Sequence, residues 1–199
     1  MFLTRTGFRK LLKRSYSGSG LKVRNDGVGY AFVGGTWAAY FLHGDIPKET
    51  LGDIISLVGE LPNIGEAYVS TKEGNQMEIV PEKIVSAMDT TAKATLIKTD
   101  VVIIRNKAYR VLQDPGSLGI TLVEEEKIES VVPGLVDADS DEELPDGPYL
   151  CSEMVEEIFP GSVCWKNDRM AFCVPYRYPS EGFETELVKY LEGKELWEL

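Results

Sequence analysis

The sequence predicts an α+β fold of mostly antiparallel β hairpins with about four helices. The first observation is that short segments alternate apolar and polar residues on either side of turn residues, as in 21–32 around Asn25-Asp26-Gly27. The second is that few segments repeat apolar residues at helical spacing, and the clearest of these follows Pro47. Because hairpins outnumber strand–helix–strand units, an antiparallel sheet is favoured over a parallel one.

The N-terminal part begins with an expected amphipathic helix over residues 3–16, which the Ser17–Gly20 stretch ends. A hairpin over 21–32 and a strand over 36–42 follow, and then a second helix after Pro47, which Gly59 stops. We expect Asp45 to cap that second helix. The expected strands after it cover 67–71 and 76–80, with a turn between them.

The C-terminal part is expected to contain a short helix from Pro81 and further strands, followed by a proline-rich acidic loop over 133–148. Ser152 is a typical cap for a helix whose Val155, Ile158 and Phe159 share one face. A hairpin that turns at 167–168 and a last helix after residue 180 complete the chain. The remaining expected strands are 94–97, 101–104, 109–112 and 118–123.

An internal duplication of a helix–hairpin–helix unit is one interpretation of the sequence. At an offset of 142 residues, Val23-Arg24-Asn25-Asp26 lies over Trp165-Lys166-Asn167-Asp168. We therefore expect a single compact domain, 1–199, with pseudo-repeats at about 1–62 and 149–199 around a central β region. Coincidence is the alternative, because helix–hairpin units with such turns are common.

Charge is distributed unevenly along the chain. The formal net charge is −11, from 21 basic and 32 acidic residues. Residues 1–24 hold seven of the basic residues and no acid, so the rest of the chain has 14 basic against 32 acidic residues, a balance of −18. The expected helix after Ser152 carries Glu153, Glu156 and Glu157. Opposite charges on the two helices favour association, within one chain or between two.

Motifs for cofactor binding are incomplete. Gly27-Val28-Gly29 begins like a dinucleotide fingerprint, but Phe32 stands at the third glycine. Asp137, Asp139 and Asp141 begin like a calcium loop, and Glu142 then occupies the position that needs glycine. His43 is the single histidine, beside the expected cap Asp45. We therefore expect no cofactor and no metal.

The three cysteines, Cys151, Cys164 and Cys173, are too few and too far apart for a disulfide framework or a Cys-x-x-Cys site. Reduced thiols in a cytoplasm are the simplest interpretation. Cys164 and Cys173 fall on the strand face opposite Trp165, where we expect them to lie on a second packed face or to be partly exposed. Nothing basic adjoins them in the sequence to lower a thiol pKa, so a nucleophilic role has no support.

The function that these observations favour is a non-enzymatic cytoplasmic protein-interaction module, which binds a protein partner or self-associates. The expected binding residues are the basic positions of the first helix, Arg9, Lys10, Lys13 and Arg14. Nucleic-acid contact through that helix is one alternative. Duplicated units with basic helices are similar to sliding clamps at the level of fold, without a matching motif. A variant is a DNA-mimicking inhibitor that uses the acidic stretch 137–157.

The second alternative is a small hydrolase with an unrecognised carboxylate site, because 32 acidic residues allow many pairings. A membrane partner is not expected, since no apolar run approaches the roughly 20 residues needed to cross a bilayer. The basic opening segment has the composition of a transit peptide as well. We expect it to be a helix of the fold.

Overall fold

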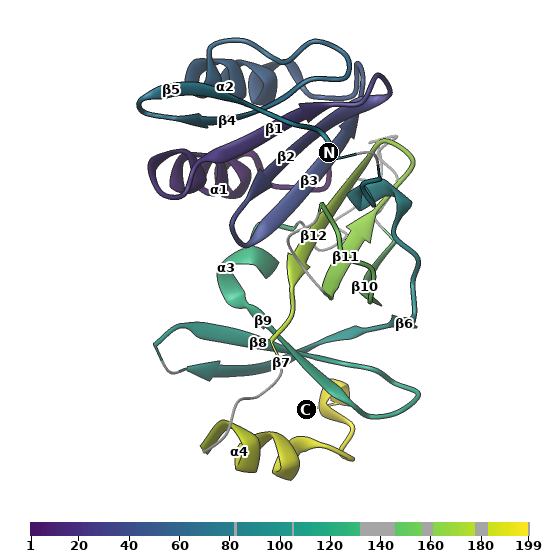
Figure 1. Ribbon diagram of the computed structural model, residues 1–199. Coiled ribbons are helices and arrows are strands. Elements are labelled where there is room, and N and C mark those ends of the chain that lie inside the picture. The colour runs from purple at the N-terminus through teal and green to yellow at the C-terminus, as the bar shows by residue number, and fades with distance from the viewer. Residues whose placement is uncertain (82, 105, 132–145, 157–160, 178–182, 199) are drawn as a thin grey trace.

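The computed structural model describes residues 1–198 except 82, 105, 132–145, 157–160 and 178–182 (Figure 1). Within these described residues, four α-helices and twelve strands confirm the α+β class with antiparallel hairpins. The elements, with short 3₁₀ helices marked η, are α1 Arg5–Ser17, β1 Leu21–Asn25, β2 Gly29–Gly34, β3 Trp37–Leu42, α2 Lys48–Val58, β4 Ala67–Thr71, β5 Gly74–Glu78, η1 Ala87–Asp89, β6 Ala94–Thr95, β7 Ile97–Ile104, β8 Ala108–Gln113, β9 Ile120–Glu124, α3 Glu125–Ile128, β10 Asp146–Cys151, β11 Ser162–Lys166, β12 Met170–Pro175, α4 Phe183–Leu191 and η2 Leu196–Glu198.

Nine strands form one antiparallel sheet in the order β5-β4-β1-β2-β3-β12-β11-β10-β6. The hairpin β11–β12 joins the sheet where β12 pairs with β3, with Met170 opposite Phe41 and Cys173 opposite Ala38. Strands from the two ends of the chain therefore lie side by side. The edges of this sheet are β5 and the two-residue strand β6.

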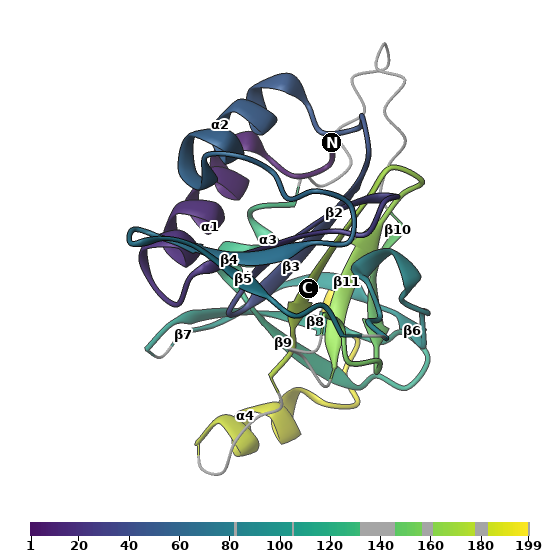
Figure 2. The same cartoon turned by 45° about the horizontal axis from the view of Figure 1, so that its top comes forward.

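The helices α1 and α2 cover one face of the large sheet (Figures 1 and 2). Phe8, Leu11 and Leu12 of α1 are almost fully buried against this face, where the Phe8 ring meets Trp37 edge-on at 5.6 Å. The Thr4 hydroxyl accepts a hydrogen bond from the Gly7 N–H at 3.2 Å and caps the helix. The predicted first helix is thus confirmed, and its apolar stripe forms part of the main core.

The opposite face of the large sheet carries mostly small side chains, including Ala31, Ala38 and Ala171. Two irregular segments, 84–90 and 152–156, cover it and are held together by a bridge between Val85 and Val155. The helix predicted after Ser152 is therefore wrong over 152–156. The remainder of that helix, 157–160, lies outside the described residues.

The short helix predicted from Pro81 is also wrong in extent, because the described residues of this segment form only the 3₁₀ turn η1. Val85 is used for the bridge to Val155 instead of a helical face. Of the predicted acidic loop 133–148, the last three residues belong to β10 and the rest lies outside the described residues. The sequence interpretation also missed the short helix α3.

The second sheet, β7-β8-β9, lies at the other end of the molecule and packs against α4 and η2 (Figure 1). Where the two sheets meet, a bridge joins Leu122 of β9 to Arg177, just after β12. We call this junction of β9, α3 and residues 175–177 the waist. The main core runs through it, since Leu112 and Val123 belong to the same cluster as Phe8 and Phe41.

Both predicted hairpins form, β1–β2 over 21–34 and β11–β12 over 162–175. They lie on either side of β3 in one sheet. The first hairpin follows helix α1, whereas the residues described before the second, 152–156, are not helical. A duplicated helix–hairpin–helix unit is therefore not shown.

Candidate interaction sites: a basic helix and an open sheet edge

The basic residues of α1 are exposed, and part of their charge is used within the chain. Arg9 Nε lies 3.3 Å from Asp53 Oδ1 on α2, and Arg5 Nε donates to Asp53 Oδ2 at 2.8 Å. At the other end of the helix, Arg14 Nη1 donates to Glu126 Oε2 of α3 at 2.6 Å. The acidic surface nearest to Arg9 and Arg14 thus belongs to the same molecule.

Lys10 and Lys13 lie on the same helix and are exposed. Neither forms an ion pair with a residue that the structure describes, although Lys13 is close enough to help lower the pKa of Asp53. Of the four predicted binding residues, these two retain uncompensated charge. They are the part of the basic helix that remains for an external partner.

The strand β5 forms an open edge of the large sheet. It pairs with β4 on one side, from Gly74 opposite Thr71 to Glu78 opposite Ala67. All five of its residues are exposed. Met77 is 65% exposed and Ile79, just beyond the strand, is 93% exposed. Large apolar side chains therefore flank an edge whose outer backbone groups no described strand pairs with.

The direction of these backbone groups follows from the hairpin geometry. A two-residue turn, Lys72-Glu73, closes the β4–β5 hairpin at the pair Thr71–Gly74. In an antiparallel pair, residues that exchange hydrogen bonds alternate with residues that do not, starting from the closing pair. The N–H and C=O groups of Asn75 and Met77 therefore point away from β4, toward the open edge.

A buried ion pair ties the covering segment 152–156 to the large sheet. Arg24 Nη2 donates to Glu156 Oε1 at 2.8 Å, and both side chains are almost fully buried. Burial raises the pKa of Glu156 despite the nearby Arg24. Glu156 also has a positive φ of 49°, which a helix does not allow. Glu156 is therefore a buried structural residue and not part of an exposed acidic helix.

Asp26 completes this charged cluster at the β1–β2 turn. Its Oδ1 accepts hydrogen bonds from the backbone N–H groups of Val28 and Gly29, at 3.0 and 2.9 Å, and from the Tyr40 hydroxyl at 2.9 Å. Although burial alone raises the pKa of Asp26, these hydrogen bonds and the nearby Arg24 outweigh it and hold the pKa below its ordinary value. The cluster stabilises the turn.

His43 and Asp45 do not form a catalytic pair. His43 Nε2 lies 3.0 Å from Asn25 Oδ1, and its ring packs 4.7 Å from that of Tyr30. The predicted cap at Asp45 is wrong, because Pro47 occupies the N-cap position of α2 and no side chain caps it. Proline has the fixed φ that suits a helix start, so the chain enters α2 without a side-chain cap.

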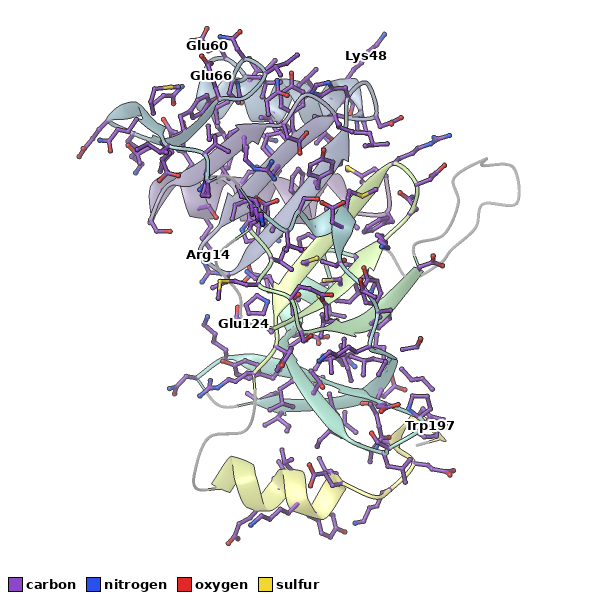
Figure 3. The ribbon with its side chains drawn as sticks, turned by 45° about the vertical axis from the view of Figure 1, so that its right-hand side comes forward. Arg14, Lys48, Glu60, Glu66, Glu124 and Trp197 are labelled. Carbon is purple, nitrogen blue, oxygen red and sulfur yellow. The ribbon has the colours of Figure 1, made fainter. Side chains whose placement is uncertain are left out.

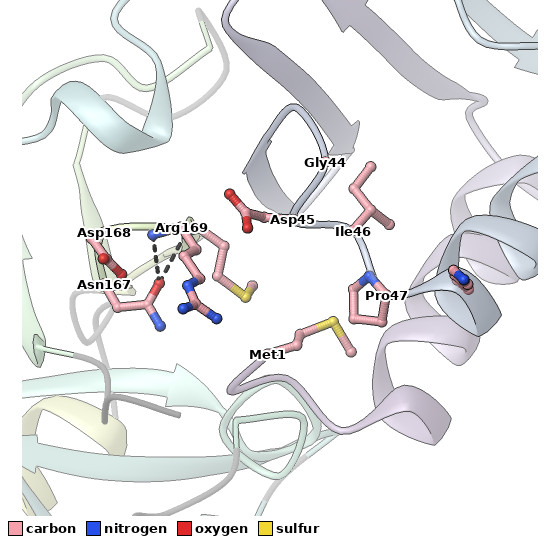
Figure 4. A pocket seen from close by; sticks show the side chains of 10 residues that line it. Met1, Gly44, Asp45, Ile46, Pro47, Asn167, Asp168 and Arg169 are labelled. Atoms are coloured by element: carbon pink, nitrogen blue, oxygen red, sulfur yellow. Dashed lines mark hydrogen bonds between the residues drawn. The ribbon is translucent and has the colours of Figure 1, made fainter. Parts of the chain in front are cut away.

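A hollow of about 330 Å³ lies between the turn before α2 and the β11–β12 turn (Figure 4). Asp45 and Asp168 line it from these two turns, together with Lys48 and Arg169. Asn167 Oδ1 accepts hydrogen bonds from the backbone N–H groups of Arg169 and Met170, both at 3.0 Å, which fixes the β11–β12 turn. The two carboxylates are balanced by two cationic side chains, so this arrangement does not favour the hydrolase alternative.

All three cysteines are free thiols and are buried, so of the two alternatives expected for Cys164 and Cys173 the second packed face is the one that forms, and partial exposure is wrong. They lie on the sheet face opposite Trp165, as expected, but segments 84–90 and 152–156 cover that face. Burial raises the pKa of Cys164, and a hydrogen bond with Cys164 raises that of Cys151. Both thiols are therefore protonated at neutral pH and poor nucleophiles.

In the part of the chain that the structure describes, no three His, Cys, Asp or Glu side chains converge as metal ligands. Within the same residues, no helix has the length and apolar character that crossing a membrane requires.

Comparisons with known proteins leave the family open. No family model matches the chain, and no curated protein matches it. One solved structure, the DNA polymerase III beta chain from Streptococcus pneumoniae TIGR4, is similar over 93% of this chain at 7% identity, with a TM-score of 0.30. This chain covers 66% of that protein's length. A similarity this weak carries no argument about fold or function.

Proposed function

We propose that this protein is a non-enzymatic protein-interaction module that self-associates by pairing the β5 edges of two copies. The observation that carries the proposal is the open strand β5, which is exposed along its whole length beside Met77 and Ile79. Strand addition at such an edge supplies main-chain hydrogen bonds and covers apolar side chains at the same time.

Two of the other edge strands, β7 and β6, are less suited to pairing than β5. The strand β7 has a register irregularity between Lys98 and Val102, and it exposes the charged residues Lys98 and Asp100. Bulges and exposed charges are the usual means of blocking edge-to-edge pairing. The edge strand β6 has only two residues. By contrast, β5 pairs regularly with β4 along five residues.

Charge complementarity favours one register for two antiparallel β5 strands. When Asn75 lies on the two-fold axis, Lys72 of one copy faces Glu78 of the other, and this pair occurs twice. Asn75 is one of the residues whose backbone groups point outward, so this register also aligns donors with acceptors. A closed two-fold pairing of this kind produces a dimer and not a filament.

The basic helix supplies the second candidate function, nucleic-acid contact. Lys10 and Lys13 support it, because they retain uncompensated charge on an exposed helix face. The pairing of Arg9 and Arg14 with Asp53 and Glu126 reduces the charge available to phosphate. Free buried cysteines support a reducing compartment, for which we propose the cytoplasm.

Sedimentation velocity at several protein concentrations tests the proposal. We expect the wild type to form a dimer and the double variant M77K/I79K to remain a monomer. The matched control is I104K, which places the same charge on an exposed isoleucine of β7, 79% exposed. We expect this variant to dimerise like the wild type. A monomeric wild type at all concentrations, or a dimer that I104K disrupts and M77K/I79K does not, would overturn the proposal.

A further inference from the structure

A cavity of about 260 Å³ lies at the waist. Its lining includes Thr36 before β3, Tyr109 of β8, Glu124 at the end of β9, Lys127 of α3 and Arg177 after β12. The bridge between Leu122 and Arg177 forms one wall. Figure 3 shows Glu124 at this junction of the two sheets, below Arg14. Residues from five separate segments therefore surround one space.

Lys127 is a buried cation whose pairing with the nearest carboxylate is loose. Its side chain is only 4% exposed, and its Nζ lies 3.9 Å from Glu124 Oε2. It donates no hydrogen bond to any residue described here. An ammonium group buried in this way is costly unless it is paired and hydrogen-bonded. Burial accordingly lowers the pKa of Lys127.

The glutamates around Lys127 are already paired with other cations. Glu124 Oε1 accepts a hydrogen bond from Lys107 Nζ at 2.5 Å, and Glu126 pairs with Arg14 at 2.6 Å. Between them, Glu125 accepts from Arg110 Nε at 2.7 Å. Each of these carboxylates thus pairs with a different cation, and none of the three cations is Lys127. Lys127 is the surplus positive charge of the group.

A second cation lines the same cavity. Arg177 Nη1 donates to the Tyr109 hydroxyl at 2.9 Å, and its guanidinium lies 5.4 Å from the centre of the Tyr109 ring. This contact orients the Arg177 side chain, which lines the same cavity as Lys127. Lys127 and Arg177 are thus the two cations of the lining, and Glu124 is its one carboxylate.

We propose that this cavity binds the oxyanion group, carboxylate or phosphate, of a small molecule, and that Lys127 Nζ is its principal ligand. A bound oxyanion supplies hydrogen-bond acceptors, which Lys127 lacks among the residues that the structure describes, and charge-assisted hydrogen bonds of this type are the strong ones. The volume of about 260 Å³ fits a small molecule. The site is independent of the β5 edge.

Isothermal titration of the wild type with inorganic phosphate and with acetate tests the site and distinguishes the two sources of the oxyanion. We expect one anion bound per chain, and a tenfold or greater loss of affinity in K127M. The matched control, K98M, removes an exposed lysine of β7 and keeps the affinity. Equal affinity in K127M and the wild type would overturn the proposal. So would the absence of binding of either anion at concentrations up to about 10 mM, since a dissociation constant of about 1 mM already corresponds to weak binding.

Lysine footprinting of the wild type provides a test that depends on no variant. An amine-acylating reagent is applied with and without the anion that binds, and each lysine is followed by peptide mass spectrometry. We expect the anion to slow the labelling of Lys127 at least severalfold and to leave that of Lys98 unchanged. Equal labelling of Lys127 in both conditions would show that the anion binds elsewhere.

Discussion

Arg24 Nη2 donates a 2.8 Å hydrogen bond to Glu156 Oε1, which joins strand β1 to a segment 132 positions further along the chain. Glu156 Oε2 and Arg24 Nε have no hydrogen-bond partner among the described residues. A buried pair with unsatisfied atoms gains little net stability from its charges. Its value is positional, because it fixes where residues 152–156 lie on the sheet.

The first prediction concerns this buried pair. Truncating one partner, as in R24M, leaves Glu156 buried without its cation and should lower the free energy of unfolding by about 3–5 kcal/mol. The double variant R24M/E156L removes both charges and should recover most of that loss. Urea unfolding of R24M, E156L and the double variant measures the coupling energy between the two residues. A double variant as unstable as the sum of the singles would contradict the prediction.

The second prediction concerns the register of the proposed dimer. Because Lys72 faces Glu78 of the other copy, K72E should weaken dimerisation by placing like charges opposite each other. E78K should weaken it too, and it also removes the pair with Lys22 at 2.9 Å. The charge-swapped variant K72E/E78K restores opposite charges and should dimerise more tightly than either single variant. Exposed pairs contribute about 0–1 kcal/mol each.

Dimer dissociation constants from sedimentation equilibrium at low salt measure these differences. A double variant that is weaker than both singles would exclude this register while leaving strand pairing itself intact. The outcome for M77K/I79K therefore remains a separate test.

The third prediction concerns the basic helix α1. Lys10 and Lys13 have no described ion pair, so K10E/K13E should leave the free energy of unfolding within about 0.5 kcal/mol of the wild type, as is usual for surface positions. Arg14 is paired with Glu126, and R14E places like charges together, so it should be less stable than K10E/K13E. Urea unfolding provides both comparisons.

The variant K10E/K13E also tests the alternative function, nucleic-acid contact. If the wild type binds duplex DNA with an affinity that falls steeply with salt and that K10E/K13E abolishes, the nucleic-acid function replaces the proposed one. Under our proposal, DNA binding is absent at physiological salt.

Much of the fold could be predicted because its signals are local. The turns at Asn25 and Asn167 follow from side-chain oxygens that accept backbone N–H groups within the same turn, at 3.0 Å in both cases. The first helix follows from its apolar stripe. The helix expected after Ser152 does not form over 152–156, because its pattern is local and contacts with residues distant in the sequence determine the conformation there. Val155 pairs with Val85, and Glu156 is drawn to Arg24.

The candidate sites were less accessible from the sequence. Alternation in residues 74–80 does not distinguish an edge strand from a central one, because both have the same period. Nor does a run of three glutamates before Lys127 indicate a buried lysine, since such runs usually form a solvated helix face. The surplus charge of Lys127 can be seen only in the folded protein, where three cations distant in the sequence pair with these glutamates. They are Arg14, Lys107 and Arg110.

The fourth prediction concerns acid stability and Asp26. Its folded-state pKa lies below the ordinary value near 3.8, so its contribution to stability is present above that value and is lost as the pH falls through the folded pKa. D26N should therefore lower the free energy of unfolding at neutral pH by about 1–3 kcal/mol. The difference from the wild type should shrink in acid.

Urea unfolding at neutral pH and in acid measures this change. The matched control is D45N, because Asp45 is exposed and caps no helix. Equal effects of D26N and D45N would contradict the role assigned to the Asp26 hydrogen bonds.

The last prediction concerns Lys127 in alkaline solution without added oxyanion. Burial lowers the folded-state pKa of this amine below its ordinary value near 10.5, so between the two pKa values the unfolded chain binds more protons than the folded protein. Stability then rises with pH across that window, because the cost of burying the charge disappears as the amine deprotonates. Methionine fills a similar volume without charge, so K127M should be at least as stable as the wild type at neutral pH. It should also lack this part of the alkaline gain. Urea unfolding at pH values across the window measures the gain, with K98M as the control that retains it, and an equal gain in K127M and the wild type would mean that Lys127 does not titrate there.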